Sequence, residues 1–199
     1  MGRVSAHMML SLDGFGTGLN QTRERPFGSA DPLQLGRWMF EDADNNRAEI
    51  AAICDHGAFV MGRNMFAAPG PDAWEPEWKG WWGPNPPYHA PVFVLTHHAR
   101  PSITMEGGTV FHFVTDGPEV ALARAREAAG QRSVAIAGGV TTLRHYLNAG
   151  AVDELHLQIV PIVLGQGERL WDGMTATLEP IGARATWFAT HMDYRVTKA

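Results

Sequence analysis

The sequence predicts an α/β fold in which a central, mostly parallel mixed sheet is covered by helices on both faces. Short apolar runs alternate with helical segments along most of the chain, whereas the last part shows two strand-like segments and no helix. A helix between two buried strands implies a crossover connection, which joins parallel neighbours. The terminal segments predict an antiparallel hairpin at residues 176–197. Because 199 residues suffice for one well-buried core, we expect a single domain spanning residues 1–199.

Six apolar runs predict buried strands. The first is recognised by alternation, with Val4 and Ala6 on one face and Arg3 and Ser5 on the other. The others are mostly continuous apolar runs, which are typical of strands buried on both faces. In chain order, the predicted strands cover residues 3–10, 58–61, 91–96, 109–114, 133–137 and 152–159.

Three helices and two long loops are predicted between these strands. The middle helix has the clearest signals, because Asp116 stands at its cap position, Pro118 lies in its first turn and Gly130 follows its end. The loops are rich in glycine and proline, which interrupt regular structure. The predicted helices cover residues 44–56, 117–129 and 141–148. The predicted loops cover residues 11–31 and 67–90.

Composition and charge exclude several classes of protein. The net charge of −5 and the pI near 6.0 come without any block of Lys and Arg, so we expect no binding to nucleic acid or to an anionic membrane. The single cysteine, Cys54, cannot form an intramolecular disulfide and fits a reducing compartment. The chain shows neither the apolar part of a signal peptide nor an apolar run of about 18 residues. We therefore expect a soluble, cytoplasmic protein.

Residue types that bind phosphate follow three of the predicted strands. Arg63 could clamp a phosphate or be an ordinary solvated side chain, and Thr96 could bind phosphate or cap a turn. Gly138-Gly139 lead into a helix N-terminus, whose free N–H groups favour an anion, or form a simple tight turn. The Rossmann fingerprint GxGxxG is absent. Because the carboxyl ends of parallel strands meet at one edge, the three turns together predict a site for an extended dinucleotide.

Four segments carry motifs that can be compared with known families. They are Ser11-Leu12-Asp13-Gly14, Val60-Met61-Gly62-Arg63, Gly138-Gly139 and the run 152–170, which contains Leu164-Gly165-Gln166-Gly167-Glu168-Arg169-Leu170. Together they resemble the dihydrofolate reductase superfamily, and more narrowly the reductase domain that ends bifunctional riboflavin-biosynthesis deaminase-reductases, with its stand-alone relatives. The resemblance covers residues 3–195. It implies a dihydrofolate-reductase-like three-layer fold with about eight strands, bound NADPH and direct hydride transfer.

The resemblance also implies which residues meet NADPH. By motif position, the 2′-phosphate of the adenosine lies at Gly62, Arg63 and Asn64. The adenine ribose lies at Leu95, Thr96 and His97. The pyrophosphate lies at Gly138, Gly139, Val140 and Thr141. The nicotinamide amide meets the backbone of Met8 and Met9, under the loop that contains Phe15 and Gly16.

On the substrate side the sequence departs from the pattern of dihydrofolate reductases. Those enzymes carry an acidic residue on the first helix that binds the pterin, and the nearest counterparts here are Asn45 and Asn46. We therefore do not expect reduction of folate. The riboflavin-pathway substrate carries a ribose phosphate that needs cationic partners. The candidates are Arg23, Arg25 and Arg37, each of which could also be an ordinary loop charge.

Asp13 is the predicted catalytic residue, as a substrate ligand or proton relay just past the first strand. The alternative is that Asp13-Gly14 simply forms a turn, which this dipeptide favours. The predicted substrate-binding residues are Trp38, Phe40, Trp82 and Gln158. The loop with Trp74, Trp78, Trp81 and Trp82 could stack on a flat heterocycle, contact a partner subunit or pack on its own domain.

These residues lead to one principal function and two alternatives. The principal one is an NADPH-dependent reductase acting on a C=N or C=O bond of a small pterin- or pyrimidine-like heterocycle. The alternatives are a flavin- or nucleotide-binding protein of the same fold without reductase activity, and a structural dimer subunit. The resemblance implies a homodimer, with residues 176–197 and the tryptophan loop as contact surfaces. The nine histidines are scattered, so no metal site is expected, and Ser11 lacks the context of a serine hydrolase.

Overall fold

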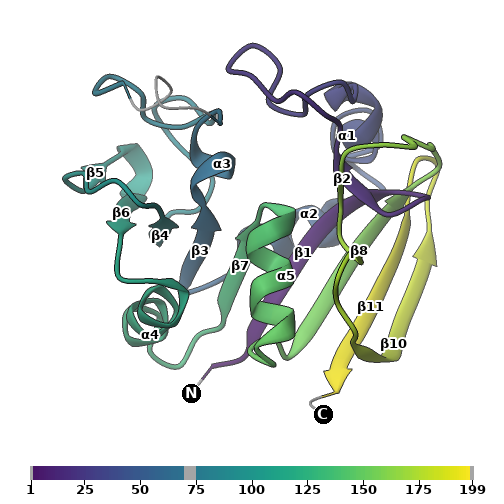
Figure 1. Cartoon of the computed structure of the whole chain (residues 1–199). Coiled ribbons are helices and arrows are strands. Elements are labelled where there is room, and N and C mark those ends of the chain that lie inside the picture. Colours follow the sequence, from purple (N-terminus) through teal and green to yellow (C-terminus); the bar gives the residue numbers. More distant parts are fainter. Residues whose placement is uncertain (1, 70–74, 198–199) are drawn as a thin grey trace.

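A nine-stranded mixed sheet runs through the whole molecule (Figure 1). The computed structural model describes residues 2–69 and 75–197. The strands are β1 (Val4–Ser11), β3 (Ala58–Gly62), β4 (Pro91–Leu95), β5 (Ile103–Thr104), β6 (Val110–Val114), β7 (Val134–Gly138), β8 (Glu154–Val160), β10 (Thr177–Ala185) and β11 (Thr190–Thr197). Their spatial order is β10-β11-β8-β1-β7-β3-β4-β6-β5.

The pairing confirms the predicted α/β fold with its closing hairpin. The strands from β8 across to β6 are parallel neighbours, whereas β10, β11 and β5 pair in the antiparallel sense at the two edges. A small second sheet, which the sequence did not predict, joins β2 (Phe15–Thr17) to β9 (Glu168–Arg169). Both of its strands are too short to show an alternating pattern.

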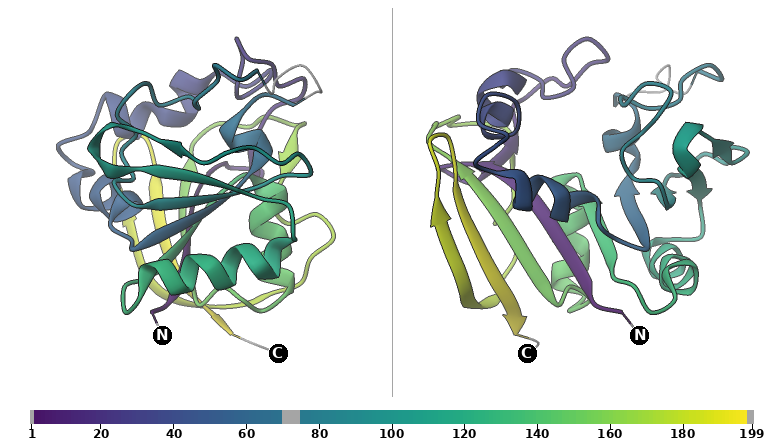
Figure 2. Two further views of the ribbon diagram at one scale, coloured as in Figure 1. Left: turned by 90° about the vertical axis from the view of Figure 1, so that its left-hand side faces the viewer. Right: turned by 180° about the vertical axis from the view of Figure 1, so that it is seen from behind.

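Helices cover both faces of the large sheet, which gives three layers (Figures 1 and 2). They are α1 (Pro32–Phe40), α2 (Arg47–Cys54), α3 (Arg63–Phe66), α4 (Pro118–Ala129) and α5 (Val140–Asn148), with a 3-10 turn at Glu106–Gly108. On one face, α4 and α5 pack against the even-numbered residues of β1 and β3, among them Val4, Ala6 and Val60. On the other face, α1 and α2 cover the side of β8 that carries Val160.

Helix α1 is absent from the sequence prediction. Asp31 caps it by accepting a hydrogen bond from the N–H of Leu33 at 2.9 Å, and Pro32 follows in the first turn. Its buried side chains, Leu35 and Trp38, pack on the sheet. Gly36 lies in the middle of the helix and lowers its intrinsic propensity. The helix is therefore stabilised mainly by its packing, which local sequence patterns do not report.

Two predicted helix starts need correction. The N-cap of α4 is Gly117, with φ 98° and no side-chain cap hydrogen bond, and not Asp116. Helix α2 covers 47–54 and not 44–56. The residues before α2 form a turn in which the side-chain N–H of Asn46 donates to the backbone oxygen of Asp42 at 2.6 Å. This turn takes the residues that the prediction had placed in the helix.

Candidate cofactor and substrate site

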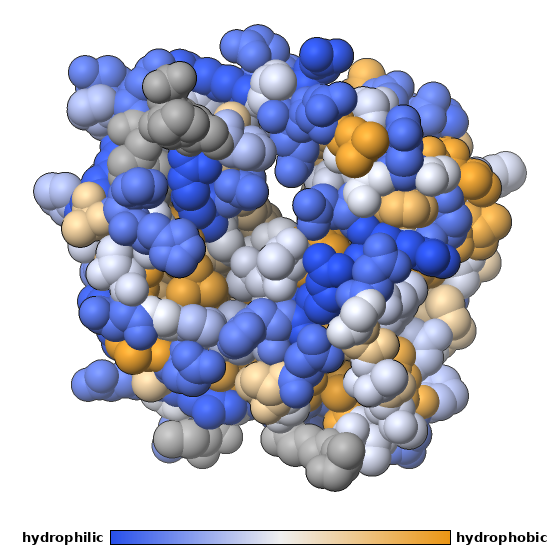
Figure 3. Space-filling model, in the orientation of Figure 1, coloured by the Kyte–Doolittle hydropathy of each residue, from blue (hydrophilic) through white to orange (hydrophobic). Residues whose placement is uncertain are grey.

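The carboxyl ends of the parallel strands meet at one edge of the sheet, the upper edge in Figure 1. Ser11, Gly62, Leu95 and Gly138 are the last residues of β1, β3, β4 and β7. Figure 3 shows that the surface is hollowed at this edge, between the part with α3 and the part with α1 and β2. The structure thus brings the predicted phosphate-binding turns to one cleft, as the topology of the strands requires.

The backbone at the N-terminus of α5 is open at Gly139. Gly139 is its N-cap and makes no side-chain cap hydrogen bond, and a Cβ placed on Gly139 would meet no atom within 4 Å. Gly138 has φ 115°, and the peptide bond between the two glycines is cis. The first N–H groups of a helix have no partner within the helix and lie at the positive end of its dipole. The arrangement suits a phosphate approaching Gly139.

Gly62 allows β3 to reach this helix. A Cβ on Gly62 would lie against the side-chain oxygen of Thr142 in the first turns of α5. The close approach places Arg63 and Asn64 at the start of α3, beside the cleft. The guanidinium of Arg63 donates to the backbone oxygen of Ala68 at 2.8 Å and to the side-chain oxygen of Asn64 at 3.3 Å. Burial lowers the pKa of Arg63. The side chain stays charged, because the pKa of an arginine lies far above neutral pH.

The turn after β4 holds Thr96 and His97. Thr96 is buried, and its hydroxyl oxygen accepts a hydrogen bond from the N–H of His98 at 3.1 Å. Thr96 therefore caps the turn, which is one of the two roles that its sequence position suggested. His97 is exposed beside it. The structure places both next to the end of β3, since β3 and β4 are parallel neighbours.

Asp13 lies at the carboxyl end of β1, but its carboxylate is engaged by its own surroundings. It accepts hydrogen bonds from the hydroxyl of Ser11 at 2.7 Å and from the backbone N–H groups of Leu164 at 3.0 Å and Gly165 at 2.7 Å. The Ser11 hydroxyl is the largest cause that lowers the pKa of Asp13, to about 2, and the two backbone amides add to it against an opposing effect of desolvation. Asp13 is ionised at neutral pH.

The four predicted substrate-binding residues are not brought together. Trp38 is fully buried, with its ring 5.2 Å from that of His191, whereas Phe40 is 69% exposed. Two residues apart on a helix, they point in nearly opposite directions. Gln158 is buried on β8 between Met9 and His191. Trp82 packs against Tyr88 and Phe111 in another cluster. A single pocket wall does not contain all four.

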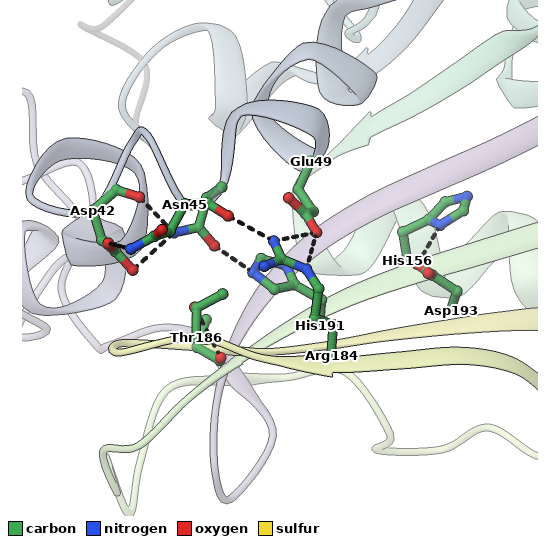
Figure 4. A network of polar contacts seen from close by, with 10 residues as sticks. Asp42, Asn45, Glu49, His156, Arg184, Thr186, His191 and Asp193 are labelled. Atoms are coloured by element: carbon green, nitrogen blue, oxygen red, sulfur yellow. Dashed lines mark hydrogen bonds and ion pairs between the residues drawn. The ribbon is translucent and has the colours of Figure 1, made fainter.

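A polar network under α2, shown in Figure 4, contains residues that sequence reasoning missed. Asn46 is fully buried, and its side-chain oxygen faces Nε2 of His191 at 2.7 Å. Because the side-chain nitrogen of Asn46 already donates to Asp42, its oxygen is the acceptor and His191 presents Nε2–H. Glu49 pairs with the guanidinium of Arg184 at 2.8 Å. No short-range sequence pattern predicts the contacts of His191 and Arg184, since both residues lie in the hairpin β10–β11, far along the chain from α2.

This network bears on the position of the acidic residue in dihydrofolate reductases. The spacing predicts Asn45 or Asn46 at this place, and both side chains are amides. The nearby carboxylates of Asp42 and Glu49 are bound to Asn46 and Arg184. Glu49 thus fastens α2 to β10, whereas Asp42 is bound within the turn before α2. That folate is not reduced stays a prediction.

The described part of the tryptophan loop packs on its own domain. The indole N–H of Trp78 donates to the backbone oxygen of Phe66 at 2.7 Å, and Trp81 packs edge-on against Trp78. Arg100 donates to the backbone oxygen of Trp78 at 2.7 Å. These contacts favour the self-packed interpretation for Trp78, Trp81 and Trp82. Trp74 lies outside the described residues.

Two features are absent from residues 2–69 and 75–197, the part of the chain that the structure describes. Within these ranges, no group of three or more His, Cys, Asp or Glu side chains is placed to hold a metal ion. In the same part of the chain, none of the helices combines the length and the hydrophobicity needed to cross a bilayer.

Comparison with known proteins identifies the family. The family model of the RibD C-terminal domain matches residues 3–187. The chain belongs to the RibD C-terminal domain family. No curated protein sequence matches it. The match of this RibD C-terminal domain spans every strand from β1 to β10 and confirms the resemblance seen in the sequence motifs.

Solved structures similar to this RibD C-terminal domain share its fold. A putative riboflavin biosynthesis protein from Shewanella sp. PV-4 aligns with a TM-score of 0.65 and 20% identity, covering 98% of this chain and 99% of that chain. The riboflavin biosynthesis reductase Rib7 of Saccharomyces cerevisiae aligns with 0.59 and 13%, covering 98% and 90%. Dihydrofolate reductase from Enterococcus faecalis, solved with NADP(H), aligns with 0.56 and 14%, covering 99% and 98%. These likenesses confirm the dihydrofolate-reductase-like fold.

Proposed function

We propose that this chain is an NADPH-dependent reductase that transfers hydride to a C=N or C=O bond of a small pyrimidine- or pterin-like heterocycle. The observation that carries the proposal is the open N-terminus of α5 at Gly139, set where the carboxyl ends of β1, β3 and β7 meet. Membership of the RibD C-terminal domain family and the reductases among its structural neighbours support it.

The residues at the cleft fit the parts of NADPH. The pyrophosphate would take the N–H groups at Gly139, Val140 and Thr141, where the helix dipole favours an anion. The 2′-phosphate would face Arg63 and Asn64, and the adenine ribose would lie beside Thr96 and His97. The nicotinamide would lie against the backbone of Met8 and Met9, beside Phe15 and Gly16. When bound, the dihydronicotinamide supplies the hydride.

The role of the protein is then to orient two flat rings and to exclude water between them. Reduction of a C=N or C=O bond also needs one proton at the heteroatom. Asp13 is already ionised and accepts three hydrogen bonds, so it carries no proton at neutral pH. We propose that solvent at the mouth of the cleft supplies the proton.

Calorimetric titration tests this proposal with NADPH and NADH on the wild type and on Arg63→Ala. We expect the wild type to prefer NADPH. The variant should lose about 1.5–3 kcal/mol of NADPH binding, as expected for a hydrogen bond to a charged group. Arg47→Ala serves as the control, because Arg47 is exposed at the start of α2 and its ion pair, with Asp44, lies on the surface.

Two outcomes would contradict the proposal. If neither nucleotide binds the wild type, the chain has the fold of the family but does not use this cofactor. If the purified protein is yellow with flavin absorbance and ignores both nucleotides, the flavin-binding alternative takes its place. Thermal unfolding of Arg63→Ala must accompany the titration, since Arg63 also holds the backbone of Ala68.

We also propose that the protein is a homodimer. Three large apolar side chains are strongly exposed, namely Leu12 at 67%, Val163 at 70% and Trp187, in the turn between β10 and β11, at 79%. Leu12 and Trp187 line the same shallow pocket beside β8. A monomeric protein seldom leaves so many large apolar side chains together in water. This surface includes the predicted hairpin.

A further inference from the structure

The carboxylate of Asp13 joins two segments that are far apart in the chain. Its two oxygens accept three hydrogen bonds, one from the Ser11 hydroxyl and two from the backbone N–H groups of Leu164 and Gly165. Its backbone oxygen accepts a fourth from Nε of Arg169 at 3.0 Å. Ser11 is fully buried, and its oxygen also accepts the N–H of Phe15 at 3.0 Å. Asp13 is thus the centre of a compact set of donors.

Further backbone contacts make these two segments one unit, which we call the β2–β9 wall and define as residues 12–17 and 162–170. The N–H of Leu12 donates to the oxygen of Ile162 at 2.8 Å, and the N–H of Leu170 donates to the oxygen of Gly14 at 2.9 Å. Phe15 pairs with Arg169 in the small sheet. Backbone hydrogen bonds thus join the two segments on either side of Asp13, at Leu12 and at Gly14.

The β2–β9 wall is also fixed to the start of α5. Gly16 packs so closely that a Cβ there would lie 2.6 Å from Cγ2 of Val140. The hydroxyl of Thr141 donates to the carboxylate of Glu168 at 3.0 Å. Consequently, the position of the wall fixes the width of the space in front of Gly139 on the side of Phe15 and Gly16.

We infer that Asp13 is a positioning residue, whose carboxylate holds the β2–β9 wall against the first turn of α5 and so shapes the nicotinamide end of the cofactor site. The inference rests on the proposed function. Two backbone N–H groups and a hydroxyl donate to this one carboxylate. Only a side chain whose two terminal atoms both accept hydrogen bonds can satisfy all three donors. An amide in its place would direct its own N–H₂ donors at one of these donors. The charge of Asp13 is used to hold backbone, and not to move a proton.

The first experiment is amide hydrogen exchange of the cofactor-free protein, comparing the wild type with Asp13→Asn. The N–H groups of Leu164 and Gly165 should exchange at least about tenfold faster in the variant, because their hydrogen bonds to the carboxylate lose their charge assistance. The control is Asp153→Asn, whose carboxylate accepts the N–H of Val4 at 2.9 Å at the opposite end of β1. Unchanged exchange at Leu164 and Gly165 in Asp13→Asn would overturn the inference.

The second experiment separates positioning from stability. Dissociation constants are measured for NADPH and for adenosine 2′,5′-bisphosphate, which lacks the nicotinamide half. Asp13→Asn should weaken NADPH about tenfold and leave the bisphosphate unchanged, whereas Asp153→Asn should alter neither. Equal weakening of both ligands, or of neither, would show that Asp13 only stabilises the fold and would sink the positioning role.

A milder variant covers the case in which Asp13→Asn does not fold. Ser11→Ala removes one donor to Asp13 and the acceptor of the Phe15 N–H, and it keeps both backbone hydrogen bonds to the carboxylate, so a smaller weakening of NADPH alone is expected. If the wild type binds the bisphosphate and NADPH equally well, the wall makes no contact with the nicotinamide half and the inference fails while a nucleotide site remains. If the wild type binds neither, the proposed function and this inference both fall, and faster exchange at Leu164 then marks Asp13 as a stability residue.

Discussion

On the sheet face beneath α2, the ring of His7 contacts those of two other histidines, His56 and His156. Its ring stacks on that of His156 at 4.5 Å, and Nδ1 of His156 lies 2.7 Å from the carboxylate of Asp193. Burial, together with the smaller effects of the neighbouring His156 and His56, lowers the pKa of His7 to about 3. His7 is therefore neutral in the folded protein, although an unfolded chain would protonate it near its ordinary pKa of about 6.5.

This difference predicts a loss of stability in mild acid. Below the unfolded pKa the unfolded chain binds a proton that the native state refuses, so stability should fall as the pH drops from 6.5 towards 3 and stay level above 6.5. At pH 5 the loss from His7 alone should be about 2 kcal/mol.

Urea unfolding between pH 6.5 and pH 3 measures this loss of stability. His7→Phe keeps a stacking ring without a titrating group and should reduce the slope of the profile, to which His56 and His191, whose pKa burial also lowers, still contribute. The exposed control His98→Phe should leave the slope unchanged. Equal slopes in both variants would rule out His7 as the cause.

At the scale of elements, the junction of β3 with α5 fixes the floor of the cleft. The strand ends at Gly62, directly against Thr142 of the helix. A methyl group at residue 62 would collide with the Thr142 hydroxyl but would lie 3.5 Å from its Cβ, which is ordinary contact. The backbone conformation of Gly62, with φ −75°, suits any residue. The glycine is needed here for space between two elements.

A double variant tests that reading. Gly62→Ala should destabilise the protein by about 1–3 kcal/mol, the usual cost of overpacking a tight contact. Adding Thr142→Ala removes the colliding oxygen and should restore most of the loss. Chemical unfolding of the two single variants and the double variant measures the coupling. Strictly additive losses would show that Gly62 and Thr142 do not meet as described.

The sequence could predict the elements whose stability is local or whose burial is continuous. The apolar runs of β3, β4 and β7 and the glycine after α4 were sufficient to locate those elements. It could not predict β2 and β9, whose pairing joins Phe15 to Arg169 across most of the chain. The same limit applies to the site. Gly138 and Gly139 are visible as a motif, whereas the partners of Asp13 and the contact of Asn46 with His191 arise only when distant segments fold together.

At the scale of the whole molecule, the exposed apolar surface around Trp187 predicts an oligomer. We expect light scattering to give the mass of a dimer for the wild type. Val163→Ser with Trp187→Ser should shift the protein to a monomer, because about 25 cal/mol per Å² of buried apolar area is lost at the interface. Val120→Ser, on the exposed side of α4, is the matched control. A wild type that is monomeric at every concentration would refute the homodimer.

The central place of β1 has a consequence for how the chain is made. β1 is flanked by β7 and β8, which come from far later in the sequence. During synthesis on a ribosome, the side chains of Val4, Ala6 and Leu10 therefore stay exposed until β7 and β8 have both emerged. Pairings between such distant segments form slowly, and exposed apolar strands invite aggregation in the meantime. We expect nascent chains that end before β8 to remain unfolded and to depend on chaperones, and the sheet to close only when translation is nearly complete.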